Sequence, residues 1–367
     1  MFAPVAFEDL TFPNQALKVW SGFEAQQWMR AGQQFNTTIC QYDTTTTRIS
    51  SDYGSGPAKW GHGSLAPNGN IYCMGHVRSD FAIINTYTDA VTTTGSIGSR
   101  SSQGSVYDKV TNNVYGFGDS GAKINTATNV ASTITGPPNR SDNPIQGWDA
   151  NILSTAGFFN YSGTRQYSIS ANTTATTAAT PGNANYGEWG TLGIDGNMYQ
   201  TNVPGGSNML KFDPVANTTA NIALGAGSFA GVLQHYNGKL YILPNGATRV
   251  AEYDFSTNAV TTTLTLPSAR LFSGACIGAD GKIWGCASSS GTLTWIDVYN
   301  NTSGTVTVGN GDVSYQGIQM GALGDLYLIP WSGTNGYFHK LKLVKGSGYV
   351  QKIIQEFNQG GRLSWAG

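Results

Sequence analysis

The sequence predicts an all-β protein built from a repeated unit of about 43 residues. Three recurring features predict it: a turn followed by an aromatic residue, a glycine before that turn, and an Asp or Asn about a dozen residues after the aromatic. The clearest copy of the turn is Asp280-Gly281-Lys282-Ile283-Trp284. Asp-Gly between two strand-like segments is typical of a two-residue type I′ hairpin, in which both central residues have positive φ.

The first two features recur as regular columns along the chain. Steps between aromatic residues are 40 to 44 residues, and steps between glycines are 41 to 43 residues. The aromatic column consists of Trp28, Tyr72, Tyr115, Phe159, Tyr199, Tyr241, Trp284 and Tyr327. The glycine column consists of Gly61, Gly104, Gly147, Gly190, Gly231, Gly274, Gly317 and Gly360.

The third column pairs an apolar or aromatic residue with an Asp or Asn and precedes a turn rich in Thr and Asn. Its copies are Tyr42-Asp43, Ile84-Asn85, Ile124-Asn125, Phe212-Asp213, Tyr253-Asp254 and Ile296-Asp297. The side chain of Asp or Asn can accept a hydrogen bond from the backbone two residues on, which predicts an Asx turn between two strands.

Each unit therefore contains four short strands, of which strand A carries the glycine and strand B the aromatic residue. Four strands in 40 to 50 residues are typical of a propeller blade. We expect a single β-propeller of eight four-stranded blades, with seven as the alternative because Trp28 is the weakest anchor. The segment from Trp28 to about Ser50 lacks a strand A, and the strand near 362–365 lacks the other three. We expect these two ends of the chain to form one composite closing blade, which removes a free sheet edge.

The unbroken repeat predicts one propeller domain over residues 21–367, preceded by an arm over residues 1–20. The apolar side chains of this arm are candidates for docking to a partner, with packing over one face of the ring as the alternative. They are Phe2, Phe7, Phe12, Leu17 and Trp20.

Composition argues against several function classes. Charged residues make up 11% of the chain and the net charge is −1, whereas ordinary soluble domains have roughly 25% charged residues. The absence of a basic run argues against nucleic-acid binding. No run of 18 apolar residues predicts membrane insertion, and the first residues do not resemble a signal peptide. The neutral polar surface is typical of secreted proteins and virion components.

Few side chains are candidates for catalysis or metal binding. The four histidines are His62, His76, His235 and His339, and none is placed beside a carboxylate that could orient it. In the predicted hairpin Cys276 lies opposite Gly285 and Cys286 opposite Ala275, so we expect free buried thiols instead of a disulfide. No Cys or His pair has the spacing of a zinc site. We expect no catalytic residue, no metal and no cofactor.

The residues beside the strand A glycines offer the best candidate ligand site. Strand A lines the central channel of a propeller, and aromatic and amide side chains at its mouth are suited to stacking on sugars and binding their hydroxyls. The alternative is structural, with the Gln side chains bound to neighbouring backbone and the Trp side chains packed between blades. The candidates are Trp60, His62, Gln103, Gln146, Trp148, Trp189, Gln316 and Gln359.

The Asp-Gly-x-Ile-Trp hairpin at 280–284 and the Asp-x-x-Thr-Asn turn at 254–258 resemble the repeats of NHL and streptogramin-lyase propellers. The resemblance covers the chain from about Trp28 to the end and implies a propeller fold. For a lyase it also implies metal-assisted elimination by a His and an acidic ligand at the channel mouth. No blade offers those two residues together, so the activity is not carried over.

We therefore expect a non-enzymatic propeller of a phage particle, located in the tail, in a fibre or on the capsid. It would be made in the host cytoplasm, dock to other virion proteins in a homo- or hetero-oligomeric assembly, and contact host surface glycans. One alternative is a soluble lectin-like propeller whose repeated weak sites bind carbohydrate by avidity. A second is a lyase-type propeller enzyme.

Overall fold

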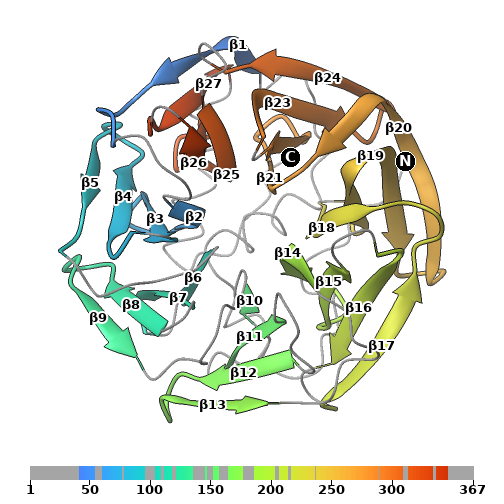
Figure 1. Ribbon diagram of the computed structural model, residues 1–367, viewed down its shortest axis with the longest axis horizontal. Helices are drawn as coiled ribbons and strands as arrows, with labels where there is room; N and C mark the ends of the chain where they lie inside the picture. Colours follow the sequence, from blue (N-terminus) through green and yellow to red (C-terminus); the bar gives the residue numbers. More distant parts are fainter. Residues whose placement is uncertain are drawn as a thin grey trace, which may run out of the picture.

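The computed structural model describes residues 41–345 of the 367, except for 54–59, 77, 96–103, 109–110, 118–120, 135–144, 147–151, 157–163, 177–185, 203–205, 214–215, 236, 288, 309–312 and 334–335. Every helix or strand in this part of the chain is a β-strand. The sheets are arranged around a common centre, with one strand of each sheet near the centre and one at the rim (Figure 1). The prediction of an all-β ring of small antiparallel sheets is confirmed.

Five of the sheets have four strands each, and in four of these the order from centre to rim follows the chain. One contains β2 (Trp60–Leu65), β3 (Asn70–Gly75), β4 (Phe81–Asn85) and β5 (Val91–Thr93). The next contains β6 (Ser105–Asp108), β7 (Asn113–Gly116), β8 (Gly121–Asn125) and β9 (Ala131–Ile134). A third contains β10 (Ile145–Gln146), β11 (Ile152–Ala156), β12 (Thr164–Ser168) and β13 (Thr173–Thr176). A fourth contains β21 (Gly274–Ile277), β22 (Ile283–Ala287), β23 (Ser290–Asp297) and β24 (Thr302–Thr307).

A seven-stranded sheet joins two chain segments through a single parallel contact between Trp189 and Gly231. The first segment contains β14 (Tyr186–Leu192), β15 (Met198–Asn202), β16 (Asn208–Asp213) and β17 (Thr218–Ala223). The second contains β18 (Phe229–Gln234), β19 (Leu240–Asp254) and β20 (Ala259–Leu271). The Tyr241 hydroxyl lies 3.0 Å from the Glu252 carboxylate, so the two halves of β19 lie side by side. Gly246, with a φ of 69°, lies between these halves.

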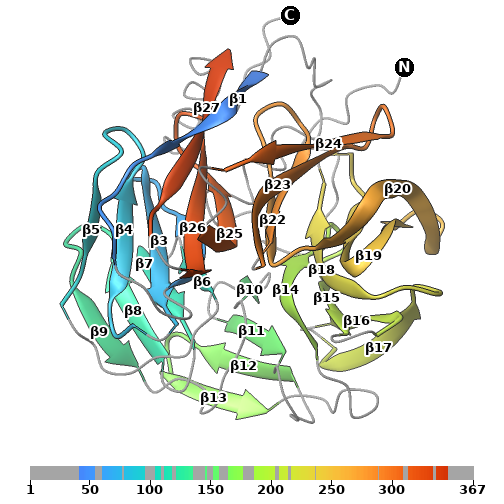
Figure 2. The ribbon, with the colours of Figure 1, turned by 45° about the horizontal axis from the view of Figure 1, so that its top comes forward.

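The closing sheet combines strands from both sides of the chain. It contains β25 (Val313–Met320), β26 (Leu326–Gly333), β27 (His339–Lys345) and, at the rim, β1 (Gln41–Arg48). Tyr42 is opposite Leu343 and Arg48 is opposite His339, and Figure 2 shows β1 running beside β27. The expectation that N-terminal and C-terminal strands share a sheet is confirmed. This sheet, however, takes one strand from the N-terminal side and three from the C-terminal side, the reverse of the expected division. Trp28 and residues 362–365, on which that expectation relied, lie outside the described part.

The predicted turn type is wrong. In the 280–284 hairpin only Gly281 has a positive φ, of 77°, while Asp280 does not. The Gly278 amide donates to the Lys282 carbonyl and the Gly281 amide donates to the Gly278 carbonyl. These bonds define a three-residue loop with a type I turn followed by a left-handed glycine. The register shifts by one residue, so Cys276 lies opposite Trp284 and Cys286 opposite Gly274. Cys73, Cys276 and Cys286 are free and buried, and Cys40 lies outside the described residues.

The predicted Asx turns are confirmed between the third and fourth strands. The Asn85 carboxamide oxygen accepts from the amides of Tyr87 and Thr88 at 3.0 and 3.1 Å, and Asp297 does the same for Tyr299 and Asn300. Each turn ends with a residue in the left-handed region. The left-handed residues at these turns are Asp89, Asn129, Asn172, Asn217, Asn258 and Asn301.

The core lies between neighbouring sheets. One cluster combines Ile71 and Cys73 of the β2–β5 sheet with Tyr327 and Ile329 of β26, all fully buried. Full burial of such a side chain contributes about 1.5–3 kcal/mol to folding. Within the described residues, no helix is long and apolar enough to cross a membrane.

Candidate functional site

His62, on β2, lies at the centre of the ring and bridges two other sheets. Its Nε2 is 2.8 Å from the carbonyl oxygen of Ser273, just before β21. A Cβ atom at Gly274 would lie 2.5 Å from His62 Cε1, and one at Gly317 would lie 3.0 Å from His62 Cα. These glycines are therefore required because the neighbouring innermost strands approach too closely for a side chain.

His62 is neutral at pH 7. His62 is half-buried, and loss of solvent around its imidazole lowers its pKa to about 4, although the hydrogen bond to Ser273 opposes this effect. Since a carbonyl can only accept, the proton lies on Nε2. The structure thus presents His62 as a neutral donor with its proton already committed to the protein backbone.

The two described tryptophans among the candidates lie in separate clusters between sheets. The Trp189 ring covers Gly231, where a Cβ would approach ring atoms to 2.2 Å. Trp60 is fully buried, with its ring centroid 5.0 Å from those of both Tyr53 and Phe338. The Arg78 guanidinium lies 4.7 Å from the Trp60 ring centroid. These contacts correspond to the structural alternative, in which the tryptophans pack between sheets.

The remaining candidates are only partly described. Gln316 is 2% exposed, and its backbone carbonyl lies close to Gly274 beside His62. Gln146 belongs to β10, without a described side chain. Among the candidates whose side chains are described, the structure therefore brings His62 and Gln316 together. The candidates outside the described residues are Gln103, Trp148, Gln359, Phe2, Phe7, Phe12, Leu17 and Trp20.

Two members of the aromatic column have a role that the sequence did not reveal: Tyr72 and Tyr327 bind the third-to-fourth strand turn of the next sheet. The Tyr72 hydroxyl is 3.2 Å from the Thr126 carbonyl and 2.7 Å from Asn129 Oδ1. The Trp284 ring packs edge-on against Tyr42, with a centroid distance of 5.3 Å. The Tyr42 hydroxyl in turn donates to the Gly324 carbonyl and accepts from the Ala279 amide.

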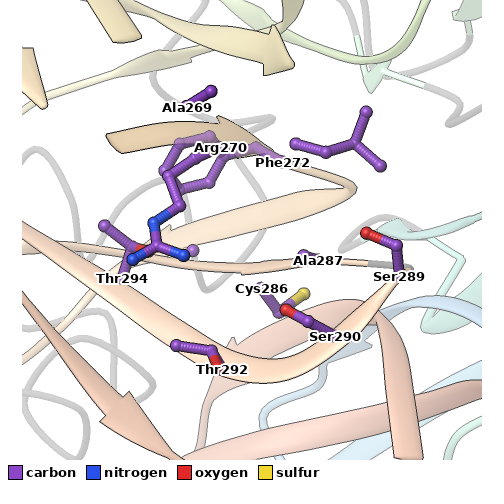
Figure 3. Close-up of a pocket in the computed structure, with 11 residues that line it drawn as sticks. Ala269, Arg270, Phe272, Cys286, Ala287, Ser289, Ser290, Thr292 and Thr294 are labelled. Carbon is purple, nitrogen blue, oxygen red and sulfur yellow. The ribbon is translucent and has the colours of Figure 1, made fainter. Parts of the chain in front are cut away.

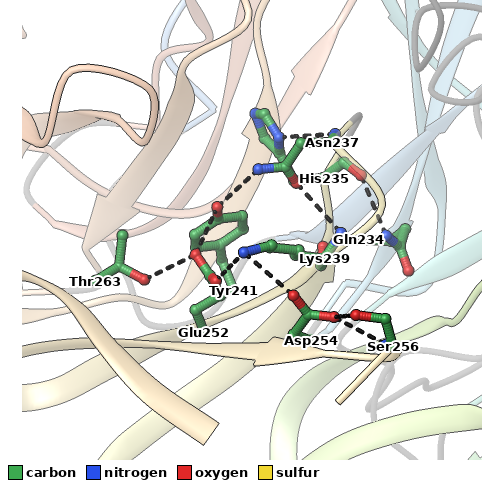
Figure 4. A network of polar contacts seen from close by, with 9 residues as sticks. All are labelled: Gln234, His235, Asn237, Lys239, Tyr241, Glu252, Asp254, Ser256 and Thr263. Carbon is green, nitrogen blue, oxygen red and sulfur yellow. Dashed lines mark hydrogen bonds and ion pairs between the residues drawn. The ribbon is translucent and has the colours of Figure 1, made fainter. Parts of the chain in front are cut away.

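A network of charged and polar side chains extends this contact in the β18–β20 segment (Figure 4). Glu252 accepts from Lys239, from the Tyr241 hydroxyl at 3.0 Å and from Thr263 at 3.1 Å. Buried His235 donates from Nε2 to the Gly281 carbonyl of the neighbouring sheet at 2.9 Å. Burial lowers the pKa of His235 and, as the main cause, raises that of Tyr241. The Glu252 contacts stabilise the β18–β20 segment itself, and the His235 hydrogen bond links it to the neighbouring sheet.

A pocket of about 200 Å³ lies between the end of β20 and the strands β22 and β23 (Figure 3). Arg270 and Phe272 line one side, and Cys286, Ser290, Thr292 and Thr294 line the other. Sequence reasoning missed it. The available signal was the alternation of Ser290, Thr292 and Thr294, which puts three hydroxyls on one face of a strand.

No group of three or more His, Cys, Asp and Glu side chains in the described ranges is arranged to hold a metal ion. The expectation of buried, inert thiols agrees with the surroundings of Cys276, whose pKa is raised by burial.

Comparison with known proteins identifies the fold alone. No protein-family model matches the chain, and no curated protein matches it by sequence. A streptogramin B lyase structure superposes with a TM-score of 0.67 at 12% identity, covering 86% of this chain and 99% of that one. A catalytically inactive virginiamycin B lyase from Staphylococcus aureus with quinupristin has a TM-score of 0.67 at 11% identity, covering 83% of this chain and 100% of that one. The chain is therefore a propeller similar to these lyases in fold.

Proposed function

We propose that this chain is a non-enzymatic binding propeller of a phage particle, in the tail, in a fibre or on the capsid, where it docks to other virion proteins and contacts host surface glycans. The observation behind the proposal is the low charge of the rim, where charged residues occur only in β1, at Asp43 and Arg48, and in β20, at Arg270, among the described rim strands. The rim strands β5, β9, β13, β17 and β24 contain no charged residue and are rich in Thr.

Rim strands expose unpaired backbone N–H and C=O groups, and soluble proteins commonly protect such edges with charged residues. Here the edges are neutral, and residues such as Thr93 and Thr133 are exposed. A neutral edge that can hydrogen-bond suits a side of the molecule that other subunits cover in an assembly. Neutral polar composition across the chain, with 11% charged residues, is consistent with contacts that tolerate salt.

The proposal is tested by adding charge to the rim. Thr93→Lys and Thr133→Lys place lysines on two exposed edges and should leave folding intact while lowering incorporation into particles at least several-fold. Ala90→Lys adds the same charge in the exposed turn before β5 and is the matched control. Quantitative mass spectrometry of purified particles measures incorporation. Absence of the wild-type chain from particles of its source would overturn the proposal.

We propose that the ring has seven blades, whereas the aromatic column favoured eight. The Tyr72 hydroxyl contacts the third-to-fourth strand turn of the following sheet at Thr126. Tyr327 makes the same contact with Thr86 of the β2–β5 sheet. The sheet after β25–β27 is then β2–β5, and the seven-stranded sheet counts as two blades. Cryo-electron microscopy of the purified chain tests the blade number.

A lyase is the second candidate, favoured by the fold similarity to streptogramin B and virginiamycin B lyases. His62 lies on the innermost strand β2, but its Nε2 proton is bound to the Ser273 carbonyl. A lyase would consume quinupristin in a metal-dependent reaction that His62→Ala abolishes. Mass spectrometry of quinupristin after incubation with the chain and divalent cations distinguishes this function from a binding role. A soluble lectin, the third candidate, would instead be free of particles and bind glycan arrays when multivalent.

A further inference from the structure

The strand β20 departs from the regular rim strands around the ring. It has 13 residues, whereas β5 has three and β24 has six. Its pairing with β19 also shifts: Thr265 lies opposite Arg249 and Arg270 lies opposite Ala247, so four residues of β20 face one residue of β19. Bulges of this kind redirect side chains and are common next to binding sites. This bulge delivers Arg270 to the neighbouring sheet.

The face that Arg270 reaches is polar. Ser290, Thr292 and Thr294 alternate along β23, and their side chains line the same pocket as Arg270 (Figure 3). Between β2–β5 and β26, by contrast, the facing side chains are apolar, such as Ile71 and Ile329. Packing alone therefore does not explain a row of hydroxyl groups between two sheets.

Arg270 carries the only charge among the described lining residues. Its guanidinium makes no ion pair or hydrogen bond with any other residue that the structure describes, whereas Arg249 on the adjacent strand donates to Ala226 and Thr262. A half-buried guanidinium retains its positive charge and offers a planar, two-pronged donor that matches a carboxylate. The Arg270 charge with hydroxyl groups beside it is complementary to a ligand that carries one negative charge next to polar oxygen atoms.

We propose that this pocket binds the carboxylate-bearing sugar unit of a glycan, with Arg270 holding the carboxylate and Ser290, Thr292 and Thr294 binding ring hydroxyls. Its volume of about 200 Å³ suits a single sugar unit, since pockets for drug-sized ligands measure about 300–1,000 Å³. Phe272 supplies an apolar surface at the base of the site. The inference deepens the glycan contact within the proposed function and names the class of sugar.

The test is isothermal titration of the full chain with methyl β-D-glucuronide and with the methyl α-glycoside of N-acetylneuraminic acid. At least one acid should bind, and its methyl ester and neutral methyl β-D-glucoside should bind at least about tenfold more weakly, because a charge-assisted hydrogen bond contributes more than about 1.4 kcal/mol. Arg270→Gln should also weaken binding at least tenfold, and Thr292→Val several-fold. Arg270→Lys, which keeps the charge but loses the fork, should give an intermediate affinity.

Lys342→Gln removes an equal charge from an exposed position on β27 and should bind like the wild type. Near-ultraviolet circular dichroism confirms that each variant is folded. The proposal is overturned by the absence of binding for both acids at about 10 mM, by equal binding of acid and ester, by unchanged affinity in folded Arg270→Gln, or by inorganic phosphate competing as well as the acids. These outcomes are independent of particle incorporation, so failure here is distinguishable from failure of the virion proposal.

Discussion

The hydroxyl of Tyr327 donates to the backbone carbonyl of Thr86 at 3.0 Å, across 241 positions of sequence. The same hydroxyl is 2.9 Å from Asp89, whose carboxylate also pairs with Lys340. The contact links the last B strand of the described chain to the first complete sheet. It repeats at this junction the contact that Tyr72 makes with Thr126.

Tyr327→Phe is expected to lower the free energy of unfolding by about 1–2 kcal/mol, because it removes the donor to Thr86 and leaves a buried carbonyl with fewer hydrogen bonds. Urea denaturation followed by intrinsic fluorescence measures the change. Tyr87→Phe, at a residue 46% exposed, is the matched control and should differ little from the wild type. Equal stability of the two variants would show that the junction does not depend on this hydroxyl.

Gly274→Ala is expected to be strongly destabilising, by about 1–3 kcal/mol or more. The added methyl group would lie 2.5 Å from both the Gln316 carbonyl oxygen and His62 Cε1, and the backbone oxygen has little freedom to move. Gly95→Ala is the control, since a Cβ there meets nothing within 4 Å. A thermal melt that gives both variants the same Tm would contradict the assigned role of the glycine column.

His62 should make the protein sensitive to acid. Its folded pKa of about 4 lies below the ordinary value of 6.5, so its contribution to stability is complete above pH 6.5 and is lost as pH falls from 6.5 to 4. The loss over this whole range is on the order of 3–4 kcal/mol, because each unit of pKa difference corresponds to about 1.4 kcal/mol. His62→Gln should reduce this pH dependence in urea denaturation at pH 7 and pH 4.5. An unchanged pH dependence in the variant would refute the prediction.

Asp280 should lower the stability of the protein as pH rises, which is the opposite of the effect of His62. Burial raises its pKa from 3.8 to about 6, although donation from the Trp284 indole and the Lys282 amide opposes the shift. Its carboxyl group is then most favourable to the fold below pH 3.8, and that contribution disappears as pH rises through 6. Asp280→Asn should gain stability relative to the wild type at pH 8 and lose this advantage at pH 4.5. The comparison requires only chemical denaturation at the two pH values.

Sequence reasoning located most strands because each needs a local residue type: Gly281 for a left-handed turn position, Asn85 for an Asx turn, and Tyr72 for a buried position. It misjudged the turn type because Asp-Gly occurs both in two-residue loops and in three-residue loops with a glycine bulge. The partner choice of β1 depends on where the ring closes, and repeat spacing alone does not determine that. The pocket was missed because Arg270 and Thr292 belong to different sheets, and only the bulge in β20 brings them together.

The pairing of Tyr42 with Leu343 has a consequence for biosynthesis. Ribosomes add roughly 5–20 residues per second, so β1 leaves the ribosome about 15–60 s before β27 is available to pair with it. During that interval one edge of β1 has no sheet to join, and the growing ring remains open. Any helper protein or assembly partner that shields β1 must therefore act on the nascent chain and be displaced by the chain's own last strands. A circular permutant that begins at β2 and carries β1 after β27 would remove this delay, because the two strands would emerge together.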